Sequence, residues 1–138
     1  MSTSTIDLTV ADVMLPLERM PVVKASTMLK ATLQAMTTHR LGIACIVGDD
    51  GKLNGVFTDG DVRRMLLRDQ KPFAALFVDD IIAHANKAPT TVRNADSLSS
   101  AIATMEAKQI WDLPVVASDG TLVGLLHLHP AIKAVMTA

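Results

Sequence analysis

The chain has 138 residues, of which 49% are hydrophobic, and 13 Lys and Arg against 14 Asp and Glu give a formal charge of -1. The near-neutral charge, with only three Phe and one Trp, argues against a nucleic-acid surface, and no apolar stretch approaches the roughly 20 residues of a membrane span. The first fourteen residues carry no signal-peptide pattern and Cys45 stands alone, so we expect a cytoplasmic protein without disulfides.

The dominant feature of the sequence is an internal repeat. With an offset of 69 residues the matched pairs are Leu29 with Leu98, Leu33 with Ile102, Met36 with Met105, Leu41 with Ile110, Val47 with Val116, Leu53 with Leu122 and Gly55 with Gly124. Upstream we expect an offset of 68, which pairs 10–14 (VADVM) with 78–82 (VDDII) and Pro21 with Pro89. We therefore predict two copies, residues 8–70 and 76–137.

Each copy is predicted to contain the same elements in the same order. A short apolar segment leads to a brief strand (21–24 or 89–93), and a helix follows with apolar residues at i, i+4 and i+7 and with Thr27 or Asp96 as its N-cap. Two strands (43–47 and 52–57, or 113–116 and 121–126) flank an Asp-Gly turn whose glycine has a positive φ, and a final helix (61–68 or 130–136) follows. The order β-α-β-β-α, given twice, predicts an α/β (α+β) fold whose copies pack as a pseudo-twofold pair.

Residues 55–64 (GVFTDGDVRR) lie where the first copy's second strand meets its final helix. Thr58 and Asp61 have the spacing of a capping box, which requires no ligand. The same turn can also bind one, because the backbone N–H groups at a helix start favour phosphate and a carboxylate at 61 can accept hydrogen bonds from both hydroxyls of a ribose. The two interpretations are compatible.

The double β-α-β-β-α layout, GVFTDGD after an Asp-Gly turn, and LPVV at 113–116 resemble a tandem pair of CBS domains, or Bateman module, over roughly residues 8–137. The resemblance implies a regulatory module that binds an adenosine-type or other ribonucleotide in the cleft between the repeats. GVFTDGDVRR and GLLHLHPAI are more narrowly similar to the C-terminal CBS pair of bacterial D-arabinose 5-phosphate isomerases. No sugar-isomerase domain is visible in the sequence, so a stand-alone protein and an excised regulatory part remain alternatives.

The resemblance assigns ribose and phosphate contacts to Thr58 and Asp61. The other residues that it implies at the ligand site are Val56, Phe57, Ala44, Pro21 and Val22, and His127 matches Thr58 in the second copy. Guanidinium groups suit phosphate oxygens, so one of Arg63 and Arg64 is expected to reach a ligand phosphate, and Arg64 is our candidate. Pro130 replaces the carboxylate in the second copy and has no side-chain acceptor, so we expect one competent site and one altered site. His127 and His129 are expected on one face of a strand, where they predict phosphate or sugar contacts rather than a metal site because a third ligand is missing.

The candidate ligands are AMP, ADP, ATP, S-adenosylmethionine and CMP-Kdo, and we expect no required cofactor and no catalysis, because the sequence shows no nucleophile or acid–base pair poised for a reaction. Methionine-rich helices, with Met28, Met36, Met65 and Met105, predict apolar surface that a homodimer would cover, and Trp111 is expected in a core or interface. The main alternative is a structural dimerisation module that binds no ligand.

Overall fold

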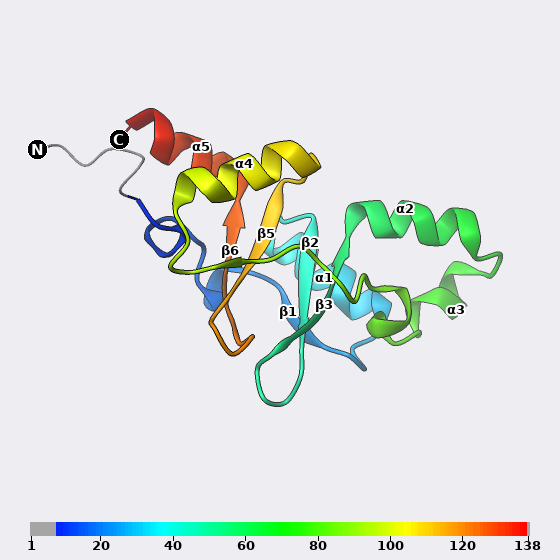
Figure 1. Cartoon of the computed structure of the whole chain (residues 1–138). Coiled ribbons are helices and arrows are strands. Elements are labelled where there is room, and N and C mark those ends of the chain that lie inside the picture. The colour runs from blue at the N-terminus through cyan, green and yellow to red at the C-terminus, as the bar shows by residue number, and fades with distance from the viewer. Residues whose placement is uncertain (1–7, 138) are drawn as a thin grey trace, which may run out of the picture. The chain divides into compact units, whose positions relative to one another are not determined.

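The computed structural model describes residues 8–137, which form two compact units (Figure 1). The first-repeat unit is Arg19–Pro89, and the second-repeat unit combines residues 8–18 with 90–137. Each unit has one three-stranded sheet with helices, so the predicted mixed α/β class is confirmed. Within residues 8–137, no helix combines the length and the hydrophobicity that crossing a membrane demands.

Both units contain the order β-α-β-β-α, and the first-repeat unit has one further short helix, Phe73–Phe77. The first-repeat unit contains β1 (Val22–Lys24), α1 (Leu29–His39), β2 (Ile43–Val47), β3 (Leu53–Thr58), α2 (Asp59–Arg68), α3 (Phe73–Phe77) and the 3₁₀ helix η4 (Ile81–His84). The second-repeat unit contains the 3₁₀ helix η2 (Val10–Asp12), β4 (Val92–Arg93), α4 (Leu98–Lys108), β5 (Asp112–Val116), β6 (Leu122–His127) and α5 (Leu128–Thr137), and the 3₁₀ helix η3 (Leu17–Arg19) lies at the junction. In each sheet the middle strand pairs in parallel with the first strand and antiparallel with the third.

The turns between the antiparallel strands follow the prediction from the Asp-Gly pairs. Gly51 has a φ of 81° and Gly120 a φ of 91°, a conformation that glycine adopts without steric cost. The strand before the first turn, β2, is buried at all five positions, which explains its uninterrupted apolar sequence IACIV. The hairpins of both copies are therefore set by local sequence.

Each unit has its own hydrophobic core. The first-repeat core contains Leu29, Met36, Ala44, Ile46, Phe57, Met65, Leu76 and Ile81. The second-repeat core contains Val10, Val92, Leu98, Ala101, Met105, Leu113, Val115, Leu126 and Ala131. The expectation that four methionines provide surface for a partner is therefore wrong for Met36, Met65 and Met105, which are buried, and only Met28 of that set is exposed.

The predicted helix caps are also corrected. The N-cap residues of α1 and α4 are Met28 and Ser97, one position after Thr27 and Asp96, and only Ser97 contributes a side-chain acceptor, to Ser100 N. The side chain of Thr27 instead accepts from Lys24 N at 3.1 Å, and that of Asp96 accepts from Arg93 N at 2.9 Å. These side chains therefore stabilise the turn between the first strand and the helix rather than capping the helix.

The segment that precedes each repeat packs on the other repeat's unit. The equivalent backbone hydrogen bonds, with their N···O distances, are Leu98 N to Leu8 O (2.9 Å) and Leu29 N to Asp79 O (2.9 Å), then Leu15 N to Leu125 O (2.8 Å) and Asn86 N to Val56 O (2.9 Å). Leu8 thus corresponds to Asp79 and Leu15 to Asn86, an offset of 71 residues, so the predicted offset of 68 is wrong.

The strands correct the proline match as well. Val23 pairs with Ile46 as Val92 pairs with Val115, which places Pro21 opposite Thr90 of the second copy rather than Pro89. The connection between the preceding segment and the first strand is two residues longer in the first copy, where it includes η3. The predicted match rested on similar residue types, whereas backbone hydrogen bonds set the actual positions of the two segments.

Candidate functional site

The turn from β3 to α2 holds Thr58 and Asp61 in a closed hydrogen-bonded pair. Thr58 N and Thr58 Oγ1 donate to Asp61 Oδ2 at 2.9 and 3.0 Å, and Asp61 N donates to Thr58 Oγ1 at 3.2 Å. Thr58 is the N-cap residue of α2, and the predicted capping box is confirmed. The turn is rigid because each partner fixes the other's backbone.

Arg64 completes this cluster from one turn further along α2. Its Nη2 donates to Asp61 Oδ1 at 2.8 Å, so both oxygens of the Asp61 carboxylate have partners. A Cβ added at Gly60 would lie 3.1 Å from that same nitrogen, so the guanidinium folds back over the first turn of the helix. The Arg64 side chain is 61% exposed and that of Asp61 12%, so the arginine lies largely in solvent and the carboxylate is largely covered.

The strand residues implied at the site lie behind the Thr58–Asp61 turn. Val56 and Phe57 precede Thr58 in β3, and Ala44 of β2 is the cross-strand partner of Phe57. Ala44 and Phe57 are 0% exposed and belong to the first-repeat core, so neither residue presents a surface to a ligand in this structure. These residues support the turn from inside the unit.

Pro21 and Val22 lie at the start of β1. Cys45 N donates to Pro21 O at 3.0 Å, and Val22 pairs with Cys45 in the parallel part of the sheet. Ile43, the β2 partner of Thr58, lies two positions before Cys45 in the strand. Pro21 is buried and Val22 is exposed, so Val22 is the one of this pair with a side chain available to a ligand.

The corresponding turn of the second copy is built from different groups. His127 ends β6, and its Nδ1 lies 2.6 Å from Oδ1 of Asp112, its cross-strand partner in β5. The expectation that His127 and His129 share a strand face is wrong, because the strand ends at His127 and His129 is the second residue of α5. Across residues 8–137, no group of three or more His, Cys, Asp or Glu side chains is placed to hold a metal ion.

Sequence reasoning did not single out Asp112. The signal is present in the repeat, where Asp112 of DLPVV matches Ile43 of IACIV, an acidic residue against an apolar one at the start of a buried strand. A charge at such a position needs a partner, and His127 is that partner.

Sequence reasoning also missed an ion-pair network after α2. Asp79 Oδ2 accepts from His84 Nε2 and pairs with Lys71 Nζ, both at 2.9 Å, while Arg68 Nε donates to Asp69 Oδ1 at 2.9 Å. Hydrogen bonds from Lys71 and His84 lower the pKa of Asp79, and the hydrogen bond from Arg68 lowers that of Asp69. The network ties the loop after α2 to η4.

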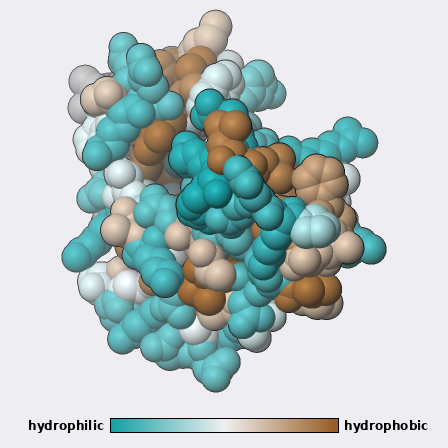
Figure 2. All heavy atoms as spheres, turned by 90° about the vertical axis from the view of Figure 1, so that its right-hand side faces the viewer, coloured by the Kyte–Doolittle hydropathy of each residue, from teal (hydrophilic) through white to brown (hydrophobic). Residues whose placement is uncertain are grey.

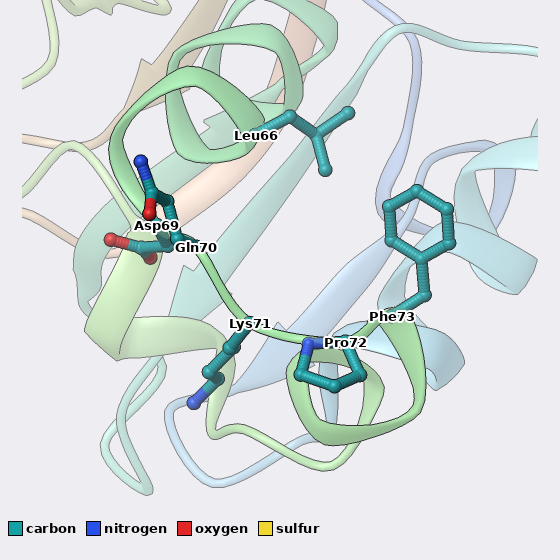
Figure 3. Close-up of a pocket in the computed structure, with 6 residues that line it drawn as sticks. All are labelled: Leu66, Asp69, Gln70, Lys71, Pro72 and Phe73. Carbon is teal, nitrogen blue, oxygen red and sulfur yellow. The ribbon is translucent and has the colours of Figure 1, made fainter.

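A shallow hollow of about 470 Å³ lies beside this network (Figure 3). Its lining residues are Leu66, Asp69, Gln70, Lys71, Pro72 and Phe73. Figure 3 shows the Leu66 and Phe73 side chains on one side of the hollow and the Lys71 ammonium turned away from them. None of its lining residues belongs to the Thr58–Asp61 turn.

Exposed apolar residues gather on the last helix of each copy. They are Leu66 and Leu67 of α2 and Ile132, Val135 and Met136 of α5, and further exposed apolar residues are Phe73, Val78 and Trp111. Figure 2 shows brown, hydrophobic side chains on the face that carries α2 and α3. Trp111 is 69% exposed, so its expected place in a core is wrong, and its place in an interface stays a prediction.

Comparison with known proteins identifies a domain family and several relatives of this chain. The sequence model described as "CBS domain" matches residues 10–68 and 78–135. The arabinose 5-phosphate isomerase KdsD of Pseudomonas aeruginosa is 36% identical over 127 residues, which cover 92% of this chain and 38% of that protein. The KdsD of Escherichia coli K12 is 29% identical, and the match covers 92% of this chain and 37% of the relative. The chain thus spans well under half the length of these relatives.

A solved structure resembles the whole described chain. The crystal structure of CBSX2 in complex with AMP, a CBS-pair protein of Arabidopsis thaliana, superposes with a TM-score of 0.81 at 26% identity and covers 94% of this chain and 96% of that one. Hypoxic Response Protein I, with two coordinated zinc ions, superposes with a TM-score of 0.75, also at 26% identity, over 91% of this chain and 98% of that one.

Proposed function

The chain belongs to the CBS domain family, and from this premise we propose that it is a regulatory module that binds a ribonucleotide at the Thr58–Asp61 turn. The observation that carries the proposal is the convergence of Thr58, Asp61 and Arg64 at the start of α2. A hydroxyl, a carboxylate and a guanidinium beside helix N–H groups suit the hydroxyls and phosphate of a nucleotide. CBSX2, which binds AMP, supports this class of ligand.

Ligand binding exchanges one hydrogen bond of Asp61 for another. Thr58 holds Oδ2, whereas among the contacts of the described residues Oδ1 is held only by the exposed Arg64 side chain. A ribose hydroxyl that donates to Oδ1 replaces Arg64 there. The displaced guanidinium, already at the helix start, then pairs with the ligand phosphate, for which its planar N–H groups are well suited. Arg64 therefore favours a phosphate-bearing nucleotide over S-adenosylmethionine.

The candidate phosphate-bearing ligands differ in their base. CBSX2 favours an adenine nucleotide such as AMP, ADP or ATP, and the relatives named arabinose 5-phosphate isomerase favour CMP-Kdo. All four ligands present both a ribose and a phosphate, so Thr58, Asp61 and Arg64 can serve each of them. The effect of binding falls on the enzyme that this module regulates, and the module itself performs no catalysis.

A thermal-shift screen tests the proposal with three matched variants. AMP at 100 times its Kd stabilises the wild type by about 2.7 kcal/mol. We expect Arg64→Gln to weaken AMP binding and to leave adenosine binding unchanged, and Asp61→Asn to weaken both. Arg63→Gln, an exposed arginine one position earlier on α2, is the control and changes neither. Equal effects of Arg63→Gln and Arg64→Gln on AMP would contradict the phosphate role.

We also propose that the chain forms a homodimer through α2 and α5, the last helix of each copy. Leu66 and Leu67 of α2 match Val135 and Met136 of α5 at the repeat offset, and all four are exposed, so both copies present an apolar patch at the same place. Sedimentation should show a dimer that Leu67→Glu dissociates. If the wild type dimerises and no nucleotide binds, the purely structural dimerisation role replaces the regulatory one.

A further inference from the structure

The connection between α2 and α3 carries a concave surface with an apolar side. The hollow of about 470 Å³ lies entirely within the first-repeat unit, and Leu66 and Phe73 form its apolar side (Figure 3). Both of these side chains are exposed. Large apolar groups that line one exposed hollow are typical of an interaction site.

Both apolar residues of the hollow are fixed to the core behind them. The Phe73 ring stacks on that of Phe77, with ring centroids 6.5 Å apart and an interplanar angle of 24°, and Phe77 packs against the first-repeat core. Leu66 follows Met65, which is a buried member of the same core. The hollow is therefore formed before a partner arrives, and binding requires little ordering of its walls.

The ion pairs beside the hollow present their basic members to solvent. The side-chain exposures are 59% for Arg68 against 27% for Asp69, and 43% for Lys71 against 23% for Asp79. Between residues 62 and 78, every exposed charged residue is a lysine or an arginine. The rim of the hollow is therefore positive toward solvent, although the whole chain has a formal charge of -1.

A partner that fits this surface combines a large apolar side chain with carboxylates. A second copy does not offer that combination from α5, which carries exposed apolar residues but no Asp or Glu. An anionic membrane takes up protruding apolar residues, whereas these residues line a concave surface. Leu67, whose substitution tests the proposed dimer, does not line the hollow.

We propose that the hollow is a docking site for an acidic segment of another protein. A large apolar side chain of that segment packs against Leu66 and Phe73, and its Asp or Glu residues pair with Arg68 and Lys71. In such a helix-in-groove contact the apolar anchor supplies most of the affinity, and the charges supply association rate and specificity. The site lies outside the Thr58–Asp61 turn and does not depend on the nucleotide proposal.

Selection from a random peptide display library on the wild-type chain tests this proposal. We expect the selected peptides to carry a large apolar residue within one helical turn of Asp or Glu. Leu66→Ser and Phe73→Ser should each weaken binding of these peptides about tenfold or more, because an apolar contact is lost. Val135→Ser is the matched control and leaves binding unchanged, since Val135 is the repeat equivalent of Leu66 and is 38% exposed against 44%. Circular dichroism verifies that the variants are folded.

Salt dependence tests the basic rim separately. Raising the salt from about 0.1 to 1 M shortens the Debye length from about 10 to 3 Å, so peptide binding should weaken, and Lys71→Gln should reduce that dependence. Selected peptides that lack acidic residues, or that bind the wild type and Leu66→Ser equally, overturn the inference. It is also overturned if dilution of the protein alone shifts the amide NMR signals of residues 66–73, which identifies a second copy as the occupant. Loss of phosphatidylglycerol vesicle binding in Phe73→Ser, without any peptide binding, identifies a membrane instead.

Discussion

Replacing Gly55 by alanine tests how tightly the segment 79–86 is bound to its sheet. A Cβ at position 55 would lie 2.8 Å from the backbone oxygen of Asn86, closer than real Cβ atoms approach other atoms. The same oxygen accepts from Val56 N at 2.9 Å, and Val56 O accepts from Asn86 N at 2.9 Å. Because the obstacle is backbone, no side-chain rotation can relieve the contact.

The expected cost follows from these contacts. If the segment separates from the strand, two backbone hydrogen bonds are lost, each about 0.5 to 1.5 kcal/mol. If these bonds are kept, the contact strains the backbone by about 1 to 3 kcal/mol. We therefore expect Gly55→Ala to lower the free energy of unfolding by about 1 to 3 kcal/mol by either route, a sizeable share of the about 5 to 15 kcal/mol typical of a folded protein. Gly124→Ala should behave alike, since its Cβ would lie 2.6 Å from Leu15 O.

Urea unfolding followed by circular dichroism measures the loss, with Gly60→Ala as the matched control. A Cβ at Gly60 would meet only the flexible end of Arg64, at 3.1 Å, and alanine is favoured over glycine in a helix by up to about 1 kcal/mol. The control should therefore be as stable as the wild type or more so. If Gly55→Ala unfolds at the same urea concentration as Gly60→Ala, the close crossing of segment and strand is refuted.

Two further predictions concern a cap and a carboxylate. Ser97→Ala should cost about 0.5 to 2 kcal/mol in a thermal melt, because Ser97 Oγ accepts from Ser100 N at 3.2 Å, and Ser97→Thr should retain most of the stability. The pKa of Asp79 is lowered in the folded state, so its contribution to stability is fully present at pH values above the usual aspartate pKa. That contribution is lost as the pH falls through the pKa of the folded state. The difference in urea midpoint between wild type and Asp79→Asn should therefore shrink on acidification, and a constant difference would contradict the Lys71 and His84 contacts.

The sequence predicted well wherever structure depends on local pattern. Leu29 and Met36 repeat at helical spacing and lie in a core, Gly51 has the positive φ that its Asp-Gly turn requires, and Thr58 with Asp61 forms the predicted capping box. In each case the deciding contacts lie within a few residues along the chain. Residue types and their spacing along the chain are therefore sufficient to predict these features.

Prediction failed where distant segments decide the outcome. Residues 10–14 resemble residues 78–82 in sequence, but Leu8 is the structural equivalent of Asp79. The carbonyl of Leu8 accepts from Leu98 N as that of Asp79 accepts from Leu29 N, and these hydrogen bonds fix the register. The short helix α3 was not predicted, since its five residues are too few for a periodic pattern. The partnership of Asp112 with His127 joins residues 15 positions apart across a hairpin, so only the strand pairing reveals it.

The two strand-to-helix turns show how one repeat can acquire two chemistries. In the first copy a carboxylate on the helix, that of Asp61, accepts hydrogen bonds from Thr58 and Arg64. In the second copy Pro130 stands where that carboxylate would be, and Asp112 supplies a carboxylate from the strand instead, beside Nδ1 of His127. The carboxylate therefore belongs to the helix in one copy and to the strand in the other, so the two turns present different groups.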